Sequence, residues 1–369
     1  EQTGNVISNQ GVGTYIEHAR NDFYSQVFNI DHKGAFKNDL FTLKWGARYQ
    51  HQHFDDFINE WEMIDSAGFS LPHPTDSIGS PNPPHPLFDI RHISKGHNIL
   101  NINNFDGFVN SEWTFNSDND DIMTLSLGLR ANYWGYNNEV NISPRAGFAI
   151  KPSWNHDMLF RLSGGIYVQP PFYRELRMFD GSLVKPQDAT TQKSYQVVLT
   201  HEYKFEAWER PFLLTTEIYY KYLKDIIPYE VDNIRIKYFA DQKATGYATG
   251  MDIRINGEFV KGIESWASLS FMKSAENIKY YLSSNGTILS QTDVNNGADF
   301  VCDTLIKGIP RPSDQKVNFS IFFQDYIPYI PSFKVNLKLV FGTGMPFGAP
   351  YSERYKHTLR MSPYRRVDI

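Results

Sequence analysis

The sequence is short of cysteine, of basic residues in excess and of long apolar runs, and each shortage argues against a class of protein. Cys302 is the single cysteine among 369 residues, so the chain can form neither an internal disulfide nor a cysteine metal cluster. The formal net charge is −5, which leaves no basic surface of the kind that nucleic acids require, so we expect no nucleic-acid partner. Charged or amide side chains interrupt every apolar run before the roughly 18 residues that a transmembrane helix needs.

Aromatic residues, by contrast, are abundant. Phe, Tyr and Trp make up 15% of the chain, although charged residues reach 21% and the mean hydropathy is −0.44. A membrane-spanning β-strand needs only about 9 to 11 residues, apolar at every second position, so a protein made of such strands keeps a low mean hydropathy. The composition therefore permits membrane strands.

Apolar and polar side chains alternate along most of the chain, which is the pattern of β-strands with two different faces. In residues 123–133 the odd positions are apolar or aromatic, and the even positions carry Thr, Ser, Gly, Arg and Asn. We predict strands at 40–50, 123–133, 142–151, 158–169, 195–205, 212–222, 247–255, 265–273, 313–325 and 333–341, and less regular strands at 23–30, 105–115 and 365–369.

The predicted connections alternate in length. Short turns are expected at 31–39, 116–121, 152–157, 206–211, 256–264 and 326–332; long connections at 55–97, 170–191, 224–246, 274–310 and 343–363, with a brief one at 135–141. Transmembrane barrels have short periplasmic turns and long extracellular loops. We therefore predict an all-β fold, a transmembrane antiparallel up-and-down β-barrel, in which residues 1–369 supply roughly thirteen strands of one barrel domain.

A soluble β-sandwich or propeller also makes two-faced strands and is the alternative fold. Propeller blades repeat every 40 to 50 residues or so, and the sequence shows no such repeat. The polar positions are rich in Gly, Ser, Thr and Asn with isolated Arg, which suits a water-filled lumen better than a surface in bulk water. Aromatic residues near strand ends, such as Trp45, Tyr49 and Tyr133, are typical of interfacial girdles.

Four segments resemble a known family. LRANYWGYNNEVNISPRAGFAIKP (Leu129 to Pro152) and LFRLSGGIYVQPPFYREL (Leu159 to Leu176) resemble mid-barrel strands of the TonB-dependent receptors of Bacteroidetes-type bacteria. PRPSDQKVNFSIFFQDYIP (Pro310 to Pro328) and MSPYRRVDI (Met361 to Ile369) resemble strands near the end of the same barrels. The resemblance extends from about Gly107 onward.

The resemblance implies an outer-membrane barrel of about 22 strands with a plugged lumen. Such a receptor imports a nutrient (a siderophore, cobalamin or a glycan) with energy passed on by TonB, and a surface lipoprotein is a possible further partner. Residues 1–13 are polar and resemble no secretory signal. We expect the plug, which contacts TonB, and the final strands to lie outside these residues, so that this part of the protein does not transport alone.

The sequence contains no catalytic motif, and we expect neither an enzyme nor a bound cofactor or metal. FGTGMPFGAP (Phe341 to Pro350) lacks the G-x-G-x-x-G spacing, and no G-x-S-x-G elbow occurs. Histidines gather around the first long connection and could bind a metal or haem, but in a polar, Pro-rich loop a solvated role is favoured. They are His51, His53, His73, His85, His92 and His97.

Two groups of residues are candidates for ligand binding, because aromatic faces stack on flat groups and Arg grips carboxylate or phosphate. One group, in the connection at 170–191, comprises Phe172, Tyr173, Arg174 and Arg177; the other, facing the lumen, comprises Arg130, Arg145 and Arg161. Packing of the loop and pairing with carboxylates are the structural alternatives for both groups. The alternative functions are a passive porin and an outer-membrane adhesin or surface binding protein.

Overall fold

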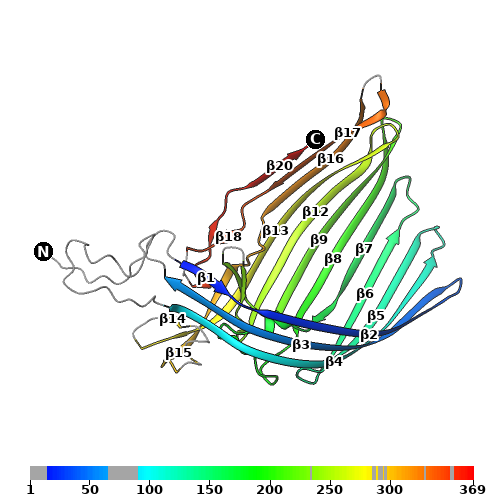
Figure 1. The fold of residues 1–369 in the computed structure, drawn as a ribbon. Coiled ribbons are helices and arrows are strands. Elements are labelled where there is room, and N and C mark those ends of the chain that lie inside the picture. The colour runs from blue at the N-terminus through cyan, green and yellow to red at the C-terminus, as the bar shows by residue number, and fades with distance from the viewer. Residues whose placement is uncertain are drawn as a thin grey trace, which may run out of the picture.

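The chain forms one large antiparallel sheet that follows the sequence order (Figure 1). The structure, a computed structural model, describes residues 15–64, 90–232, 235–284, 288–289, 294, 297–327, 330–349 and 353–369. Sixteen strands belong to the sheet, which bends into an open trough in Figure 1. Its path is β1 (Tyr15–Ala19), β3 (Phe41–Ile64), β4 (Ile90–Asn116), β5 (Ile122–Trp134), β6 (Glu139–Lys151), β7 (Asp157–Gln169), β8 (Gln192–Ala207), β9 (Arg210–Ile226), β12 (Ala244–Val260), β13 (Ile263–Leu282), β16 (Val317–Ile327), β17 (Ile330–Gly342) and β20 (Tyr364–Asp368).

The remaining elements flank this path. β2 (Asp22–Lys37) pairs with β3 on the same side as β1, and β14 (Ile288–Leu289) and β15 (Cys302–Pro310) pair with β13. β10 (Tyr229–Asp232) with β11 (Arg235–Tyr238), and β18 (Pro346–Phe347) with β19 (Leu359–Arg360), form two small hairpins. Two short 3-10 helices, η1 (Tyr173–Leu176) and η2 (Arg354–Lys356), lie in connections. Among the described residues no helix is long and apolar enough to cross a membrane.

The register gives the sheet one apolar and one polar face. Residues paired across the strands lie on the same face, and neighbours along a strand lie on opposite faces. One row from β5 to β16 comprises Leu125, Phe148, Leu162, Leu199, Ile218, Met251, Phe271 and Val317. The adjacent row on the other face comprises Thr124, Ala149, Arg161, Thr200, Glu217, Asp252, Ser270 and Asn318. We call these two sides the apolar face and the polar face.

The predicted all-β antiparallel fold is confirmed, and each of the predicted strands is found. Connections at 38–40, 117–121, 152–156, 208–209 and 261–262 are short, whereas β7 to β8, β9 to β12 and β13 to β16 are joined by long ones. Within the described residues the sheet is open, with β2 and β20 at its two edges. The alternation along the sequence was therefore sufficient to locate the predicted strands, although the structure contains further strands.

The predicted connection at 55–97 is wrong at both ends. β3 continues to Ile64 and β4 begins at Ile90, with pairing from Glu62 with His92 onward. The histidines assigned to this loop are also displaced: His51 and His53 lie in β3, His97 in β4, while His73 and His85 fall outside the described residues. The other long connections likewise contain strands that were not predicted, among them β10, β11 and β15.

The reason is that the division between the two faces is lost along the far halves of β3 and β4, where each face mixes polar and apolar residues. On the polar face Phe54 and the fully buried Ile58 alternate with Asp56 and Glu60. On the apolar face polar residues stand among the apolar Phe57 and Ile99: His51, His53 and Asp55 in β3 and His97, Asn101 and Asn103 in β4. A strand that changes its pattern midway no longer matches a single alternation, so its far half resembles a loop in the sequence.

Candidate ligand-binding site

The connection between β7 and β8, residues 170–191, folds back onto the sheet, and we call it the strap. Its apolar residues Leu176, Val184 and Ala189 are buried in a cluster with sheet residues. The sheet contributes Ile102 and Trp134, and Tyr136 of the following turn donates a hydrogen bond to the carbonyl of Val184. The strap thus covers the part of β3 to β5 where apolar residues such as Ile102 and Trp134 lie on the polar face.

Local features explain the course of the strap. The Phe172 N–H donates to the Glu175 carboxylate at 2.9 Å, and the Gln192 amide donates to the same oxygen at 3.1 Å, which fixes η1. Gly181, with φ +90, lets the strap turn against β4. The Gly181 oxygen accepts a hydrogen bond from the Asn98 amide at 2.8 Å, and a Cβ added at Gly96 would lie 2.5 Å from that oxygen.

Between the strap, the sheet and the β10–β11 hairpin lies a cavity of about 940 Å³, which we call the strap cavity. Five predicted binding residues line it: Arg130, Phe172, Tyr173, Arg174 and Arg177. The structure thus brings most of the two candidate groups together in one place, although they come from β5 and from a loop distant in sequence.

The other two predicted residues lie elsewhere on the polar face. The guanidinium of Arg145 stacks over the ring of Tyr167 at 4.3 Å from its centroid. Arg161 pairs in register with Ala149 and Thr200, and both arginines line a separate depression farther along the sheet. They do not join the strap cavity.

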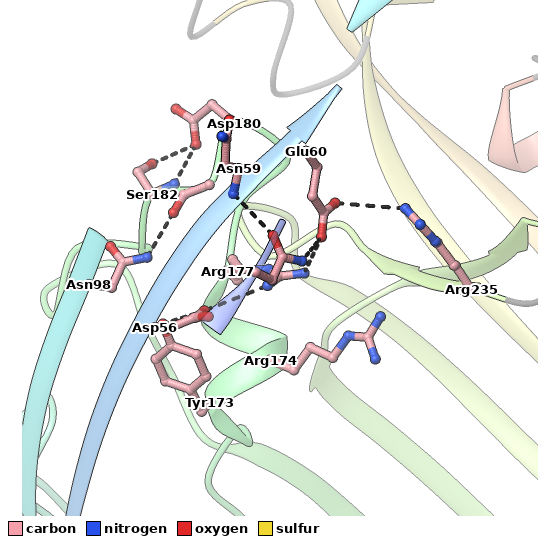
Figure 2. Close-up of polar contacts among 12 residues, drawn as sticks. Asp56, Asn59, Glu60, Asn98, Tyr173, Arg174, Arg177, Asp180, Ser182 and Arg235 are labelled. Atoms are coloured by element: carbon pink, nitrogen blue, oxygen red, sulfur yellow. Dashed lines mark hydrogen bonds and ion pairs between the residues drawn. The ribbon is translucent and has the colours of Figure 1, made fainter. Parts of the chain in front are cut away.

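Tyr173 and Arg177 hold the strap to β3 (Figure 2). The Tyr173 hydroxyl donates to Asp56 Oδ2 at 2.9 Å, and Arg177 Nη1 lies 3.6 Å from the same oxygen. Arg177 Nη2 is also 4.0 Å from Glu60, which lies 3.8 Å from Arg235 of β11. Burial and the neighbouring Asp56 carboxylate raise the pKa of the Tyr173 phenol, so Tyr173 stays protonated and remains a hydrogen-bond donor.

Aromatic rings extend this attachment. The ring of Phe54 stacks on that of Tyr173 at 4.9 Å between centroids, and the ring of Phe23 lies 5.6 Å from Tyr173. Phe172 has no such partner among the described residues and is 65% exposed. Tyr173 is therefore a packed residue, whereas Phe172 offers an open ring.

Of the two arginines, Arg130 is held by a partner within the sheet, whereas Arg174 is open to solvent. Arg130 Nη2 donates to Asp106 at 2.7 Å, which neutralises its charge on the sheet. Arg174 is exposed and makes a long hydrogen bond of 3.5 Å to the carbonyl of Ile236. In Figure 2 it lies apart from Asp56 and Glu60. Of the predicted residues, Phe172 and Arg174 are the ones placed to meet a ligand.

Several cavity residues escaped the sequence analysis because they lie in the mispredicted ends of β3 and in the β10–β11 hairpin. They are Phe54, Asp56, Glu60, Trp61, Arg235 and Lys237. Glu60 and Trp61 fall inside the expected loop 55–97, where no strand was predicted. Residues 54–61 show no alternation of polar and apolar residues, so no period-two pattern marks them as a strand.

The cavity and the strands around it hold no candidate metal centre within the described residues. In the described part of the chain no three His, Cys, Asp or Glu side chains are placed to hold a metal ion. His97 Nε2 instead contacts Asp55 at 2.8 Å, and His51 and His53 hydrogen-bond Asn103 and Asn101. These histidines thus have local partners along the strands, which corrects their assignment to a loop.

Comparison with known proteins gives matches among solved structures alone. No protein-family model matches the chain, and no curated protein sequence matches it. The copper transporter OprC is 12% identical with a TM-score of 0.47, covering 96% of this chain and 52% of that one. The RagAB peptide importer in its closed-closed state is 12% identical (TM-score 0.45; 89% and 42% covered), and the RagAB peptide transporter 13% (0.45; 90% and 42%).

These structural neighbours are named as transporters or importers. The chain spans about half of the length of OprC, 52%, and 42% of the RagAB chains. At such identities and TM-scores the likeness identifies no ligand.

Glu175 makes the attachment of the strap dependent on pH. Burial raises the pKa of Glu175 despite the hydrogen bonds from Phe172 and Gln192, which lower it. Because the folded strap prefers the protonated acid, the contribution of Glu175 to its stability is fully present at low pH and is lost as pH rises through the raised pKa. We expect Glu175→Gln to remove this dependence and to hold the strap more firmly at neutral pH.

Hydrogen exchange of residues 170–191, corrected for intrinsic rates and measured over a pH series on the full-length protein, checks this expectation. A strap whose protection in the variant keeps the pH dependence of the parent protein would contradict it.

Proposed function

We propose that the chain is part of the barrel of a TonB-dependent receptor in the outer membrane, which takes up a nutrient with energy from the inner membrane. The observation that carries the proposal is the apolar face, which continues from strand to strand between β5 and β16 while the opposite face stays polar. A sheet with an apolar outside and a polar inside suits a wall between lipid and a water-filled lumen.

The exposure of the apolar face supports a lipid environment. Leu162, Leu199 and Ile218 are 53%, 46% and 50% exposed, although they lie in the middle of paired strands. Contiguous apolar patches of this extent are rare on water-soluble monomers. In lipid they are favourable, and the antiparallel ladder satisfies the backbone groups that hydrocarbon cannot.

The strap cavity supports binding at one end of the barrel. It lies at the end with the long connections, which are extracellular in such barrels, and its lining combines aromatic rings with Arg. In this proposal the cavity recognises a siderophore, cobalamin or a glycan, a plug outside these residues contacts TonB, and a surface lipoprotein is a further possible partner. The chemistry is binding, so the protein is a transporter and no enzyme.

A passive porin and an adhesin are the competing functions. A porin needs an open lumen, whereas here a strap with a buried apolar cluster occupies one end of the polar face. An adhesin binds its partner on a protruding surface, whereas Phe172 and Arg174, although exposed, line a concave cavity. Both features favour a receptor that takes a ligand inward.

A charge on the apolar face tests the membrane environment. Arg in place of a lipid-facing residue near the bilayer midplane costs about 2 to 4 kcal/mol, and a lumen-facing substitution costs much less. We expect Leu199→Arg to lower the thermal stability of the full-length protein in the membrane, and Gln196→Arg, on the polar face of the same strand, to leave it nearly unchanged. Heat-modifiable migration on gels measures the folded fraction; equal losses for the two variants would argue against a lipid-facing β8.

The transport mechanism is tested with the full-length protein in liposomes and in pull-down assays. A plugged, energy-coupled receptor should bind the periplasmic domain of TonB and should not admit arabinose in a liposome swelling assay. Swelling without TonB binding would assign the protein to the porins. A protein that neither binds TonB nor admits arabinose would instead be an adhesin or surface binding protein.

A further inference from the structure

The strap cavity is positively charged, although the whole chain carries a net charge of −5. Three carboxylates line the cavity: Asp56, Glu60 and Asp106. Six cationic side chains line it: Arg48, Arg130, Arg174, Arg177, Arg235 and Lys237. Arg48 is paired with Asp31, which lies outside the cavity, at 2.6 Å, so five cations remain against the three carboxylates. This excess of cations in a concave site attracts anions.

The carboxylates of the cavity are engaged by groups of the protein itself. Asp56 accepts the hydrogen bond of Tyr173 and lies 3.6 Å from Arg177. Asp106 accepts hydrogen bonds from Arg130 at 2.7 Å and Asn132 at 3.0 Å. Glu60 lies between Arg177 and Arg235, at 4.0 and 3.8 Å. Each of the three thus already has a cationic partner within the protein.

Arg174 is in the opposite position. In the part of the chain that the structure describes it forms no ion pair, and its guanidinium makes one long hydrogen bond of 3.5 Å to the Ile236 carbonyl. A guanidinium presents two parallel N–H donors that match the oxygens of a carboxylate or phosphate. Arg174 therefore has donors available for a ligand anion.

The apolar side of the cavity is aromatic. Phe172 is 65% exposed and precedes Arg174 by two residues. Phe23, Phe54 and Tyr173 form a packed group of rings that also lines the cavity. Aromatic faces bind flat apolar groups by stacking. A cavity of about 940 Å³ has the size of sites for small organic molecules, which run to about 1,000 Å³.

We propose that the strap cavity binds a planar aromatic anion, with its carboxylate or phosphate held by Arg174 and its ring against Phe172. The proposal deepens the transport function and rests on it for its physiological role. Binding itself requires no energy coupling, so the two can be tested separately.

Calorimetric titration of the full-length protein in detergent tests the proposal with three probes of one ring system: 1-naphthoate, 1-naphthyl phosphate and the neutral 1-naphthamide. We expect at least one of the anions to bind about tenfold or more tightly than the amide, and Arg174→Gln to remove that advantage, as loss of a charged hydrogen bond predicts. Phe172→Ala should weaken all three probes.

Arg161→Gln is the matched control, because Arg161 lies on the same polar face outside the cavity. It should leave every affinity unchanged. Equal binding of the amide, absence of anion binding, or equal effects of Arg174→Gln and Arg161→Gln would overturn the proposal. None of these outcomes bears on TonB binding or arabinose exclusion, so failure here is distinguishable from failure of the transport function.

Discussion

The division of the sheet into one apolar and one polar face is the constraint on which the rest of the structure depends. Along the far half of β3 this division is lost: the apolar face carries His53 and Asp55 beside Phe57, and the polar face carries Phe54 and Ile58 beside Asp56. A barrel in lipid is apolar outside, and a protein in water is apolar inside. Under the proposed function, this mixed zone is the part of the strand that extends beyond the membrane.

Apolar residues on the polar face require a cover, and the chain supplies one over β4 and β5 and another over Ile278 and Tyr280 of β13. The strap buries Leu176 and Val184 against β4 and β5. At β13 the corresponding cover uses charge: Arg354 of η2 reaches Glu276 at 2.6 Å, and both side chains are almost completely buried. Removing one partner of such a pair leaves a buried charge, which costs far more than the pair contributes. Both covers come from long connections, which is why those connections are structured.

Strands whose two faces keep their polarity along the whole length could be predicted from the sequence. Strands whose faces become mixed could not. Residues 123–133 alternate throughout, because one side of the whole segment belongs to the apolar face and the other to the polar face, and β5 matches the prediction. The far half of β3 resembles a loop in the sequence, because the residues around Asp56, Glu60 and Trp61 do not alternate between polar and apolar. Phe172 and Arg174 were found by their side-chain chemistry, but their convergence with Arg130 required the fold of the strap.

The same packing determines which cavity residues remain available for binding. Attachment of the strap uses the hydroxyl of Tyr173 and the guanidinium of Arg177 on Asp56, so these residues are committed to the wall. Arg177 also lies near Glu60, and Glu60 lies near Arg235. The charges of Arg177 and Arg235 are therefore balanced by those of two carboxylates, Asp56 and Glu60. The wall is thus neutralised by its own ion pairs, and the charge of Arg174 adds to the potential of the cavity instead of being consumed. A site with paired walls and one available guanidinium discriminates by the anion it admits, because a neutral ligand of the same shape gains only the aromatic contact.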